Sequence, residues 1–98
     1  MSMDTISASQ MLFYMAHPNY QVVDLRSSEA YEAGHIAGAI NISYENLKDA
    51  LEVLPRSKTY ILYCQKGSTS LRAARWMDRQ GFDVLSLGGG YDAFIYGR

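Results

Sequence analysis

The only cysteine among the 98 residues, Cys64, stands where a thiol can be activated. The apolar run of residues 60–63 precedes it, and a short polar loop and a predicted helix follow it. Backbone N–H groups and the positive dipole end at a helix start favour a thiolate. Free cysteine is also among the most buried residue types, so inert packing is the alternative. Its place at the exit of the run favours a reactive thiol, which needs an electropositive, partly exposed setting.

The six residues after Cys64 form a polar loop that could hold an anion. They are Gln65, Lys66, Gly67, Ser68, Thr69 and Ser70. Gly67 would let the loop curl so that successive backbone N–H groups converge on one point. Lys66 is either a cation that supports the thiolate or a solvated surface charge. Arg72 and Arg75 lie one to two turns into the predicted helix, where surface or ion-pair roles are expected.

Two charged residues, Asp24 and Arg26, end another predicted strand and could form a catalytic pair. A structural role is favoured for both, because short polar residues at strand ends commonly satisfy turn backbone. Asp24 is expected to hydrogen-bond nearby loop backbone. Arg26 is expected to pair with Glu29 or Glu32 and to hold the loop beside the site.

The rest of the sequence gives no sign of a metal or cofactor site, and we expect neither. Four methionines are interpreted as core filler, because no cysteine or histidine stands at ligand spacing from them; they are Met3, Met11, Met15 and Met77. The glycines at positions 88–90 fit neither the Gly-x-Gly-x-x-Gly nor the P-loop pattern of phosphate binding.

Length, net charge and residue composition limit the classes of protein to which the chain can belong. The length of 98 residues predicts one domain, residues 1–98, with a modest core. A net charge of −1 gives no global field for nucleic acid or an anionic membrane, so neither partner is expected. The apolar runs are far shorter than the ~20 residues of a membrane helix. A lone cysteine and no secretion signal predict the reducing cytoplasm.

Capping residues, chain-breaking residues and the spacing of apolar residues predict the helices and strands of the first half of the chain. A helix begins at a Ser7 or Ser9 cap, runs through Met15 and ends at residues 17–19. A buried strand over 21–25 precedes a short helical turn over 29–33, which Ser27 or Ser28 could cap. A glycine loop over 34–39 leads to a strand over 40–42. Ser43 would then cap an amphipathic helix over 44–54.

The second half continues the alternation. A central strand over 59–63 precedes a helix over 68–80 that Gly81 ends. The inward residues of that helix are predicted to be Leu71, Ala74 and either Met77 or Trp76. A strand over 82–87 and a helix over 91–96 close the chain. Such alternation predicts an α/β fold, an open parallel sheet with helices on both faces and sites at the carboxyl ends of its strands.

Four blocks of the sequence resemble the rhodanese family of single-cysteine sulfurtransferases, in the same order over nearly the whole chain. They are residues 22–26, ending in Asp-x-Arg; 34–42, similar to Gly-His-Ile-x-Gly-Ala-x-Asn-Ile; 63–70 with 73–74, similar to the active-site loop and its helix; and 87–94, similar to Leu-x-Gly-Gly-x-x-Ala-Trp. The resemblance implies that Cys64 accepts a sulfane sulfur as a persulfide and passes it to a nucleophilic acceptor. It also implies a structural role for His35 in the glycine loop.

The sequence departs from the family at Thr69, where typical rhodanese loops carry an arginine that pairs with thiosulfate. A threonine hydroxyl supplies neither the charge nor the bidentate fork of a guanidinium. The donor is therefore either a small sulfur compound or a persulfide-bearing protein. The alternative function is a sulfur-relay or protein-interaction module with weak activity on thiosulfate. A cysteine phosphatase is disfavoured, because Ser70 stands where its loop would need arginine.

Overall fold

The computed structural model describes residues 4–97, whose centre is a five-stranded sheet with parallel pairing throughout. Its strands are β1 (Asp4–Ile6), β2 (Tyr20–Asp24), β3 (Ile40–Asn41), β4 (Thr59–Tyr63) and β5 (Asp83–Leu87). They lie in the order β1-β5-β4-β2-β3, so β4 is the central strand. The predicted α/β fold with an open parallel sheet is confirmed.

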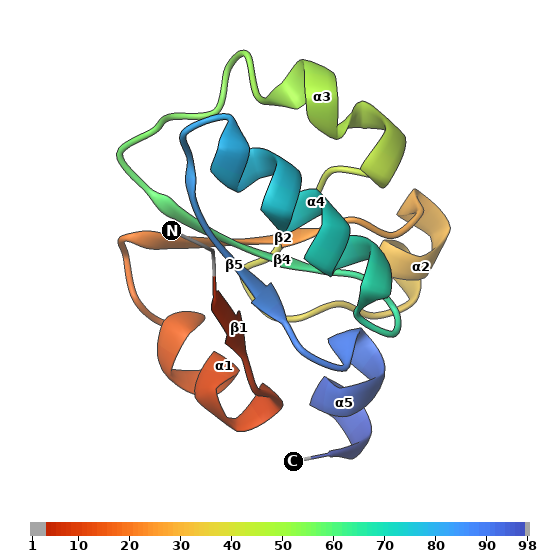
Figure 1. The fold of residues 1–98 in the computed structure, drawn as a ribbon. Helices are drawn as coiled ribbons and strands as arrows, with labels where there is room; N and C mark the ends of the chain where they lie inside the picture. The colour runs from red at the N-terminus through yellow and green to blue at the C-terminus, as the bar shows by residue number, and fades with distance from the viewer. Residues whose placement is uncertain (1–3, 98) are drawn as a thin grey trace.

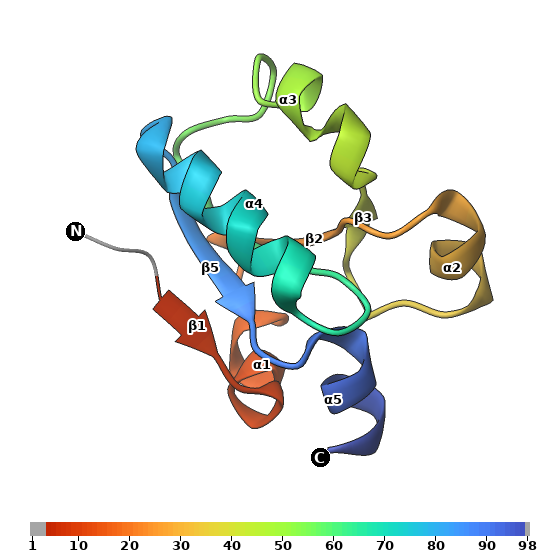
Figure 2. The same ribbon diagram turned by 45° about the vertical axis from the view of Figure 1, so that its right-hand side comes forward.

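Helices cover both faces of this sheet (Figure 1). On one face lie α3 (Leu47–Ala50) and α4 (Ser68–Arg79), and on the other α1 (Ala8–Tyr14) and α5 (Gly90–Tyr96). The short α2 (Ser28–Ala33) stands beyond the end of β2, as Figure 2 shows. Neighbouring residues of β4 point to opposite faces, so Leu62 joins the core under α4, and Ile61 joins the core under α1 and α5.

The topology changes direction at the carboxyl ends of β2 and β4. The chain leaves β2 through α2 toward β3, but it leaves β4 through α4 toward β5, on the other side of the sheet. The connections therefore diverge between these two neighbouring strands, which is where open α/β sheets bind ligands. Cys64 follows β4 and Arg26 follows β2 by two residues, so both lie at this point.

The predicted caps of three helices are confirmed. Ser7 caps α1 in a reciprocal capping box with Gln10, and the Ser27 hydroxyl caps α2 by accepting from the Ala30 N–H. Gly81 follows α4 with a φ of +92°, the left-handed conformation that favours glycine at this place. Of the methionines expected in the core, Met11 and Met77 are buried and Met15 is half-buried, while Met3 lies outside the described residues.

One strand was missed, and three predictions need correction. Strand β1 was not predicted, because three residues are too few to display a strand period. The helix predicted over 44–54 is a 3-10 turn, η1 (Tyr44–Asn46), followed by the short α3. The Ser43 side chain makes no capping hydrogen bond. Apolar spacing reports burial, and the turn after α3 also packs Leu51 and Leu54 against the core.

The third correction concerns the inward face of α4. Ser70, Ala73, Ala74 and Met77 are its buried residues, whereas Leu71 is half-exposed. Ala73 and Ser70 therefore occupy the face that was predicted for Leu71. Small side chains let α4 lie close to the sheet, and apolar periodicity undervalues them because alanine and serine carry little hydrophobic signal.

Candidate active site

Cys64 is the first residue after β4, and its sulfur is surrounded by donors from the loop that follows. The Sγ atom accepts hydrogen bonds from the Gly67 N–H at 3.1 Å and the Ser70 N–H at 3.3 Å. The Ser70 hydroxyl lies 3.5 Å from the same sulfur. Cys64 is 7% exposed, so its setting is more buried than the partly exposed one expected from sequence.

These contacts favour the thiolate. Burial opposes ionisation, but hydrogen bonds from the Ser70 hydroxyl and from the backbone N–H groups of Ser70, Gly67 and Lys66 outweigh it and lower the pKa of Cys64 below its usual value. Donors held by a folded loop are already oriented, so they stabilise the negative sulfur without reorganising. These contacts favour the interpretation of Cys64 as an activated thiol over that of an inert core residue.

Gly67 gives the loop its curl. Its φ is +111°, and it stands immediately before α4. This conformation turns the N–H groups of Gly67 and Ser70 toward the sulfur, as the expected nest requires. A Cβ at Gly67 would lie 3.0 Å from the backbone nitrogen of Gly89, so the loop also leaves no room for a side chain there.

Two further donors lie free at the start of α4. The backbone N–H groups of Ser68 and Thr69 have no acceptor within the part of the chain that the structure describes. The Thr69 hydroxyl likewise makes no hydrogen bond to a described residue. Unpaired N–H groups at a helix start attract negative charge. An anion next to Cys64 would therefore find donors that the folded chain has left unused.

Gly89 and Gly90 pack against the active-site loop, a role that sequence reasoning missed. Gly90 has a φ of +62°, and a Cβ there would meet the Cys64 carbonyl oxygen at 2.5 Å. The next N–H groups bind the loop: Tyr91 donates to the Cys64 carbonyl at 2.8 Å, and Asp92 to the Gln65 carbonyl at 3.1 Å. The signal in the sequence was the run of glycines directly after a strand.

The outer side of the loop is tied to α5. Gln65 donates from Nε2 to the Asp92 carboxylate at 2.5 Å, and this hydrogen bond lowers the pKa of Asp92. The Lys66 ammonium lies 3.4 Å from the same carboxylate, with 82% of its side chain exposed. Lys66 thus contributes a backbone N–H to the sulfur, while its side chain is a solvated surface charge.

Arg26 joins four segments around the site. It forms a 2.8 Å ion pair with Asp24, and it donates to Gln65 Oε1 at 3.0 Å and to the Gly34 carbonyl at 2.6 Å. Its guanidinium also lies over the Tyr91 ring, 4.2 Å from the centroid. The prediction that Arg26 holds the loop is confirmed, but the predicted partners Glu29 and Glu32 are wrong, because the adjacent buried Asp24 takes that place.

Asp24 is fully buried and fully satisfied. Its carboxylate accepts from the Arg26 backbone N–H at 2.8 Å, as predicted for loop backbone, and from the Tyr63 hydroxyl at 2.6 Å. Burial and this hydrogen bond raise the pKa of Tyr63, which therefore stays a neutral donor. The Tyr63 hydroxyl in turn accepts from the Ile36 N–H at 3.1 Å and so fixes the glycine loop.

The other candidate residues lie in structural roles or at the surface. His35 stacks on Tyr31 with 3.7 Å between ring centroids, and its Nδ1 lies 2.8 Å from the Tyr31 carbonyl. Arg72 and Arg75 are exposed and form no ion pair with any described residue. Over residues 4–97, no three acidic, histidine or cysteine side chains are grouped as a metal would need, and no helix is long and apolar enough to cross a membrane.

Comparison with known proteins identifies the family. Residues 7–96 match the rhodanese-like domain family, and the chain belongs to it. Its relatives include the thiosulfate sulfurtransferase GlpE of Shewanella oneidensis, 33% identical over 91% of this chain and 89% of that protein. The GlpE enzyme of Pseudomonas fluorescens is 39% identical over 72% of this chain and 66% of that protein. The enzyme class that these relatives share with this chain is sulfurtransferase.

Solved structures agree with this assignment. A rhodanese-related protein from Thermoplasma volcanium superposes with a TM-score of 0.88 at 26% identity, covering 96% of this chain and 92% of that one. The agreement over nearly the full length of both chains confirms the rhodanese-like α/β fold.

Proposed function

We propose that this protein transfers sulfane sulfur through a persulfide on Cys64. The observation that carries the proposal is the set of oriented donors from Gly67 and Ser70 around the Cys64 sulfur. Sulfur transfer needs a thiolate that can attack sulfur and later leave again, and a lowered pKa helps both tasks. The substrates are then a sulfur donor and a nucleophilic sulfur acceptor.

In the first half-reaction, the Cys64 thiolate attacks the sulfane sulfur of the donor. A new S–S bond forms at Cys64, the donor's own bond to that sulfur breaks, and its electron pair leaves with the remainder of the donor. With thiosulfate that remainder is sulfite, and with a protein persulfide it is a thiolate. The free N–H groups of Ser68 and Thr69 lie where they can stabilise the negative terminal sulfur of the persulfide.

In the second half-reaction, the acceptor attacks the terminal sulfur of the persulfide. The acceptor gains the sulfur, the S–S bond at Cys64 breaks, and its electron pair returns to Cys64 as thiolate. The hydrogen bonds from Gly67 and Ser70 stabilise this leaving group as they stabilise the resting anion. Gln65 and Lys66 contribute by holding the loop in place. Gln65 does so through its hydrogen bonds to Arg26 and Asp92.

The donor is the less determined substrate. Thiosulfate is the substrate in the names of both GlpE relatives, and the free N–H donors beside Cys64 suit an anion. Thr69 favours the second candidate, a relay of sulfur from a protein persulfide, because no guanidinium stands there to pair with a small dianion. A free buried thiol also suits the reducing cytoplasm, where we place the protein.

The test is a loading experiment on the purified protein. After incubation with thiosulfate, or with glutathione persulfide as a protein-persulfide substitute, intact mass should show one added sulfur that Cys64→Ser cannot accept. Cyanide should then release thiocyanate and restore the original mass. Loading by glutathione persulfide alone would support the relay candidate. No loading by either donor would refute the proposed function.

A further inference from the structure

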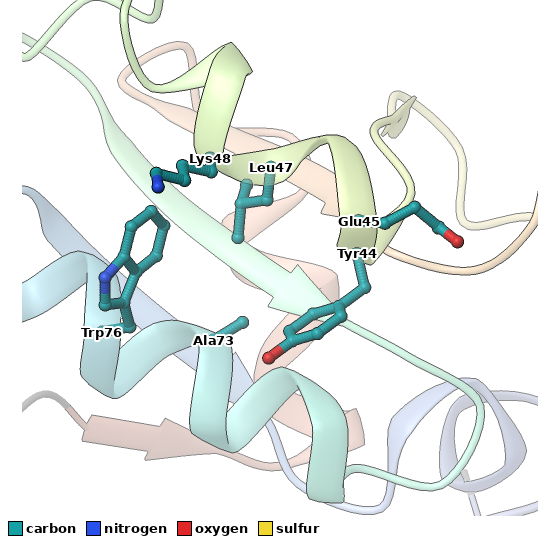
Figure 3. Close-up of a pocket in the computed structure, with 6 residues that line it drawn as sticks. All are labelled: Tyr44, Glu45, Leu47, Lys48, Ala73 and Trp76. Carbon is teal, nitrogen blue, oxygen red and sulfur yellow. The ribbon is translucent and has the colours of Figure 1, made fainter.

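A groove lies between α3 and α4, and neither Cys64 nor a residue of its loop lines it. It has a volume of about 370 Å³ and is lined by Tyr44, Glu45, Leu47, Lys48, Ala73 and Trp76. Figure 3 shows Tyr44, Leu47 and Lys48 facing Ala73 and Trp76 across it, whereas the Glu45 carboxylate points away. Tyr44 is 49% exposed, so an aromatic wall stands open to solvent.

The groove continues into a second hollow that shares Lys48 and Trp76 with it. This further part, about 270 Å³, is also lined by Leu51, Glu52, Arg56, Gln80 and Phe82. The two parts together run along the C-terminal part of α4, from Ala73 to Gln80 just after the helix. A channel of this shape suits an extended chain segment better than a compact small molecule.

Helix geometry connects the groove to Cys64. Ala73, Trp76 and Gln80 line it from α4, and residues three or four apart on a helix share a face. Four residues before Ala73 stands Thr69, on the same face and with free N–H and hydroxyl groups at the loop that holds the sulfur. The end of the groove at Ala73 is therefore about one helical turn from the loop that holds the sulfur.

The rim of the groove on α4 is basic. Arg72, Arg75 and Arg79 are exposed, and none of them forms an ion pair with a described residue. Arg72 and Arg79 stand four residues before and three residues after Trp76, so they border the groove on the outer side of the helix. Asp78 is the one acidic residue of α4, leaving the helix with an excess of positive charge.

We propose that this groove, named here the α3–α4 groove, binds an acidic, cysteine-bearing segment of the protein that accepts sulfur from Cys64. The proposal rests on the proposed function and names its acceptor. An apolar side chain of the segment packs between Tyr44 and Trp76, acidic side chains pair with Arg72 and Arg79, and the cysteine meets the persulfide.

Distances set the spacing within such a segment. From Thr69 to Trp76 is seven residues of helix, or about 10 Å along its axis. An extended chain covers ~3.3 Å per residue, so about three to four residues separate the apolar anchor from the reacting cysteine. The probe is therefore an acetylated heptapeptide with cysteine first, leucine fifth, and glutamate third and sixth. Two matched peptides carry lysine for glutamate or glycine for leucine.

The experiment measures sulfur transfer from Cys64 persulfide to each peptide as kcat/KM. We expect the acidic leucine peptide to be the best acceptor, and Trp76→Ala to lower its kcat/KM roughly tenfold, as loss of an aromatic anchor does. Arg72→Glu with Arg79→Glu should lower it about threefold or more, with the loss shrinking at high salt. This exposed pair serves even if Trp76→Ala does not fold.

The controls separate the two proposals. Phe13→Ala, an exposed aromatic on the opposite face of the sheet, and Lys58→Glu, just before β4, should leave peptide transfer unchanged. Transfer to cyanide should be the same in all variants. Equal rates for the three peptides, or unaffected transfer in the groove variants, would overturn the groove assignment. A wild-type protein that never loads sulfur refutes the proposed function instead.

Discussion

At the scale of single residues, three neighbouring acceptors compete for the hydroxyl proton of Ser70. Its buried hydroxyl lies 3.5 Å from the Cys64 sulfur, 3.1 Å from the Gly67 carbonyl and 3.2 Å from the Ser86 hydroxyl. A hydroxyl has one proton to donate. If Ser86 donates to Ser70, the Ser70 proton is available for the negative sulfur. The buried hydroxyls of Ser70 and Ser86 can thus reorient when Cys64 gains or loses its proton, without a movement of the backbone.

Removal of the Ser70 hydroxyl should make the thiol less acidic. In Ser70→Ala, Cys64 keeps its burial and its N–H donors but loses the side-chain hydrogen bond that lowers its pKa. The pH profile of Cys64 alkylation by iodoacetamide should move to higher pH, and alkylation at neutral pH should slow. Ser86→Ala, which leaves every direct donor to the Cys64 sulfur in place, should move the profile less. An unshifted profile in Ser70→Ala would contradict this assignment.

The lowered pKa of Cys64 also links stability to pH. The thiolate's hydrogen bonds stabilise the folded state fully above the ordinary thiol pKa, and this contribution is lost as the pH falls through the lower folded-state pKa. The free energy of unfolding of the wild type, minus that of Cys64→Ala, should therefore rise with pH between these two values. Urea unfolding under reducing conditions measures it, and a constant difference would contradict the shift.

We expect Thr69 to limit the use of thiosulfate as a donor. In Thr69→Arg, a guanidinium can form charge-assisted hydrogen bonds to the donor, each worth about 1.5–3 kcal/mol. The KM for thiosulfate should fall about tenfold or more, while loading by glutathione persulfide changes little. Thr69→Lys is the matched control, because lysine supplies the positive charge without the bidentate hydrogen-bonding geometry of a guanidinium. An unchanged KM in both variants would show that charge at this position does not limit donor binding.

At the scale of elements, the start of α5 sets the position of the active-site loop. Gly90→Ala should cost about 1–2 kcal/mol for the left-handed backbone alone, and more because its Cβ would meet the Cys64 carbonyl at 2.5 Å. Gly38→Ala is the matched control: its φ is +86°, but the nearest atom to a Cβ is 3.9 Å away.

Thermal unfolding and Cys64 alkylation distinguish the two glycine variants. Both should melt earlier than the wild type, Gly90→Ala by the larger amount. Only Gly90→Ala should also change the alkylation rate, because only that glycine touches the loop of Cys64. Equal melting temperatures and equal rates would show that the contact between α5 and the loop is not tight.

The sequence predicted those parts of the site that follow one another along the chain. Cys64, the curl at Gly67 and the start of α4 are local features, and their order and residue types indicated them. The ties from Arg26 to Gln65 and from Gln65 to Asp92 join residues 39 and 27 positions apart, which no local pattern can show. The groove between α3 and α4 was also invisible, because it depends on how a 3-10 turn packs against a helix.

The dependence on contacts between distant residues also explains the errors in the predicted helices and strands. The helix predicted over 44–54 rested on leucine spacing, but in the structure Leu51 and Leu54 lie in turns, where they are half-buried against the core. Strand β1 depends on pairing with β5, at the other end of the chain. Tertiary contacts decided these segments, whereas the long helix α4 and the central strand β4 carried enough local signal to be predicted.

At the scale of the whole molecule, β4 belongs to both hydrophobic clusters. Leu62 lies in the cluster under α4, and Ile61 and Tyr63 lie in the cluster under α1 and α5. A substitution that disrupts one cluster should therefore also destabilise the cluster on the other face of the sheet. We expect the chain to unfold as one cooperative unit, as small domains usually do.

Leu62→Ala tests this coupling. It should lower the free energy of unfolding by about 2–5 kcal/mol, the usual cost of truncating a buried leucine. Unfolding followed by circular dichroism and by exposure of Cys64 to alkylation should give the same midpoint in urea. Separate midpoints for the two signals would show that the face carrying the active site unfolds on its own.

The contact between residues 90–92 and the loop of Cys64 has a consequence for the newly made protein. A chain leaving the ribosome exposes Cys64 well before Gly90, Tyr91 and Asp92 can bind the loop, and β1 cannot pair until β5 is present. Until then the thiol is in an incomplete site and should behave as an ordinary, weakly acidic cysteine. We therefore expect the thiol to become reactive only after residues 90–92 have been synthesised, and a product truncated before Gly90 to lack this reactivity.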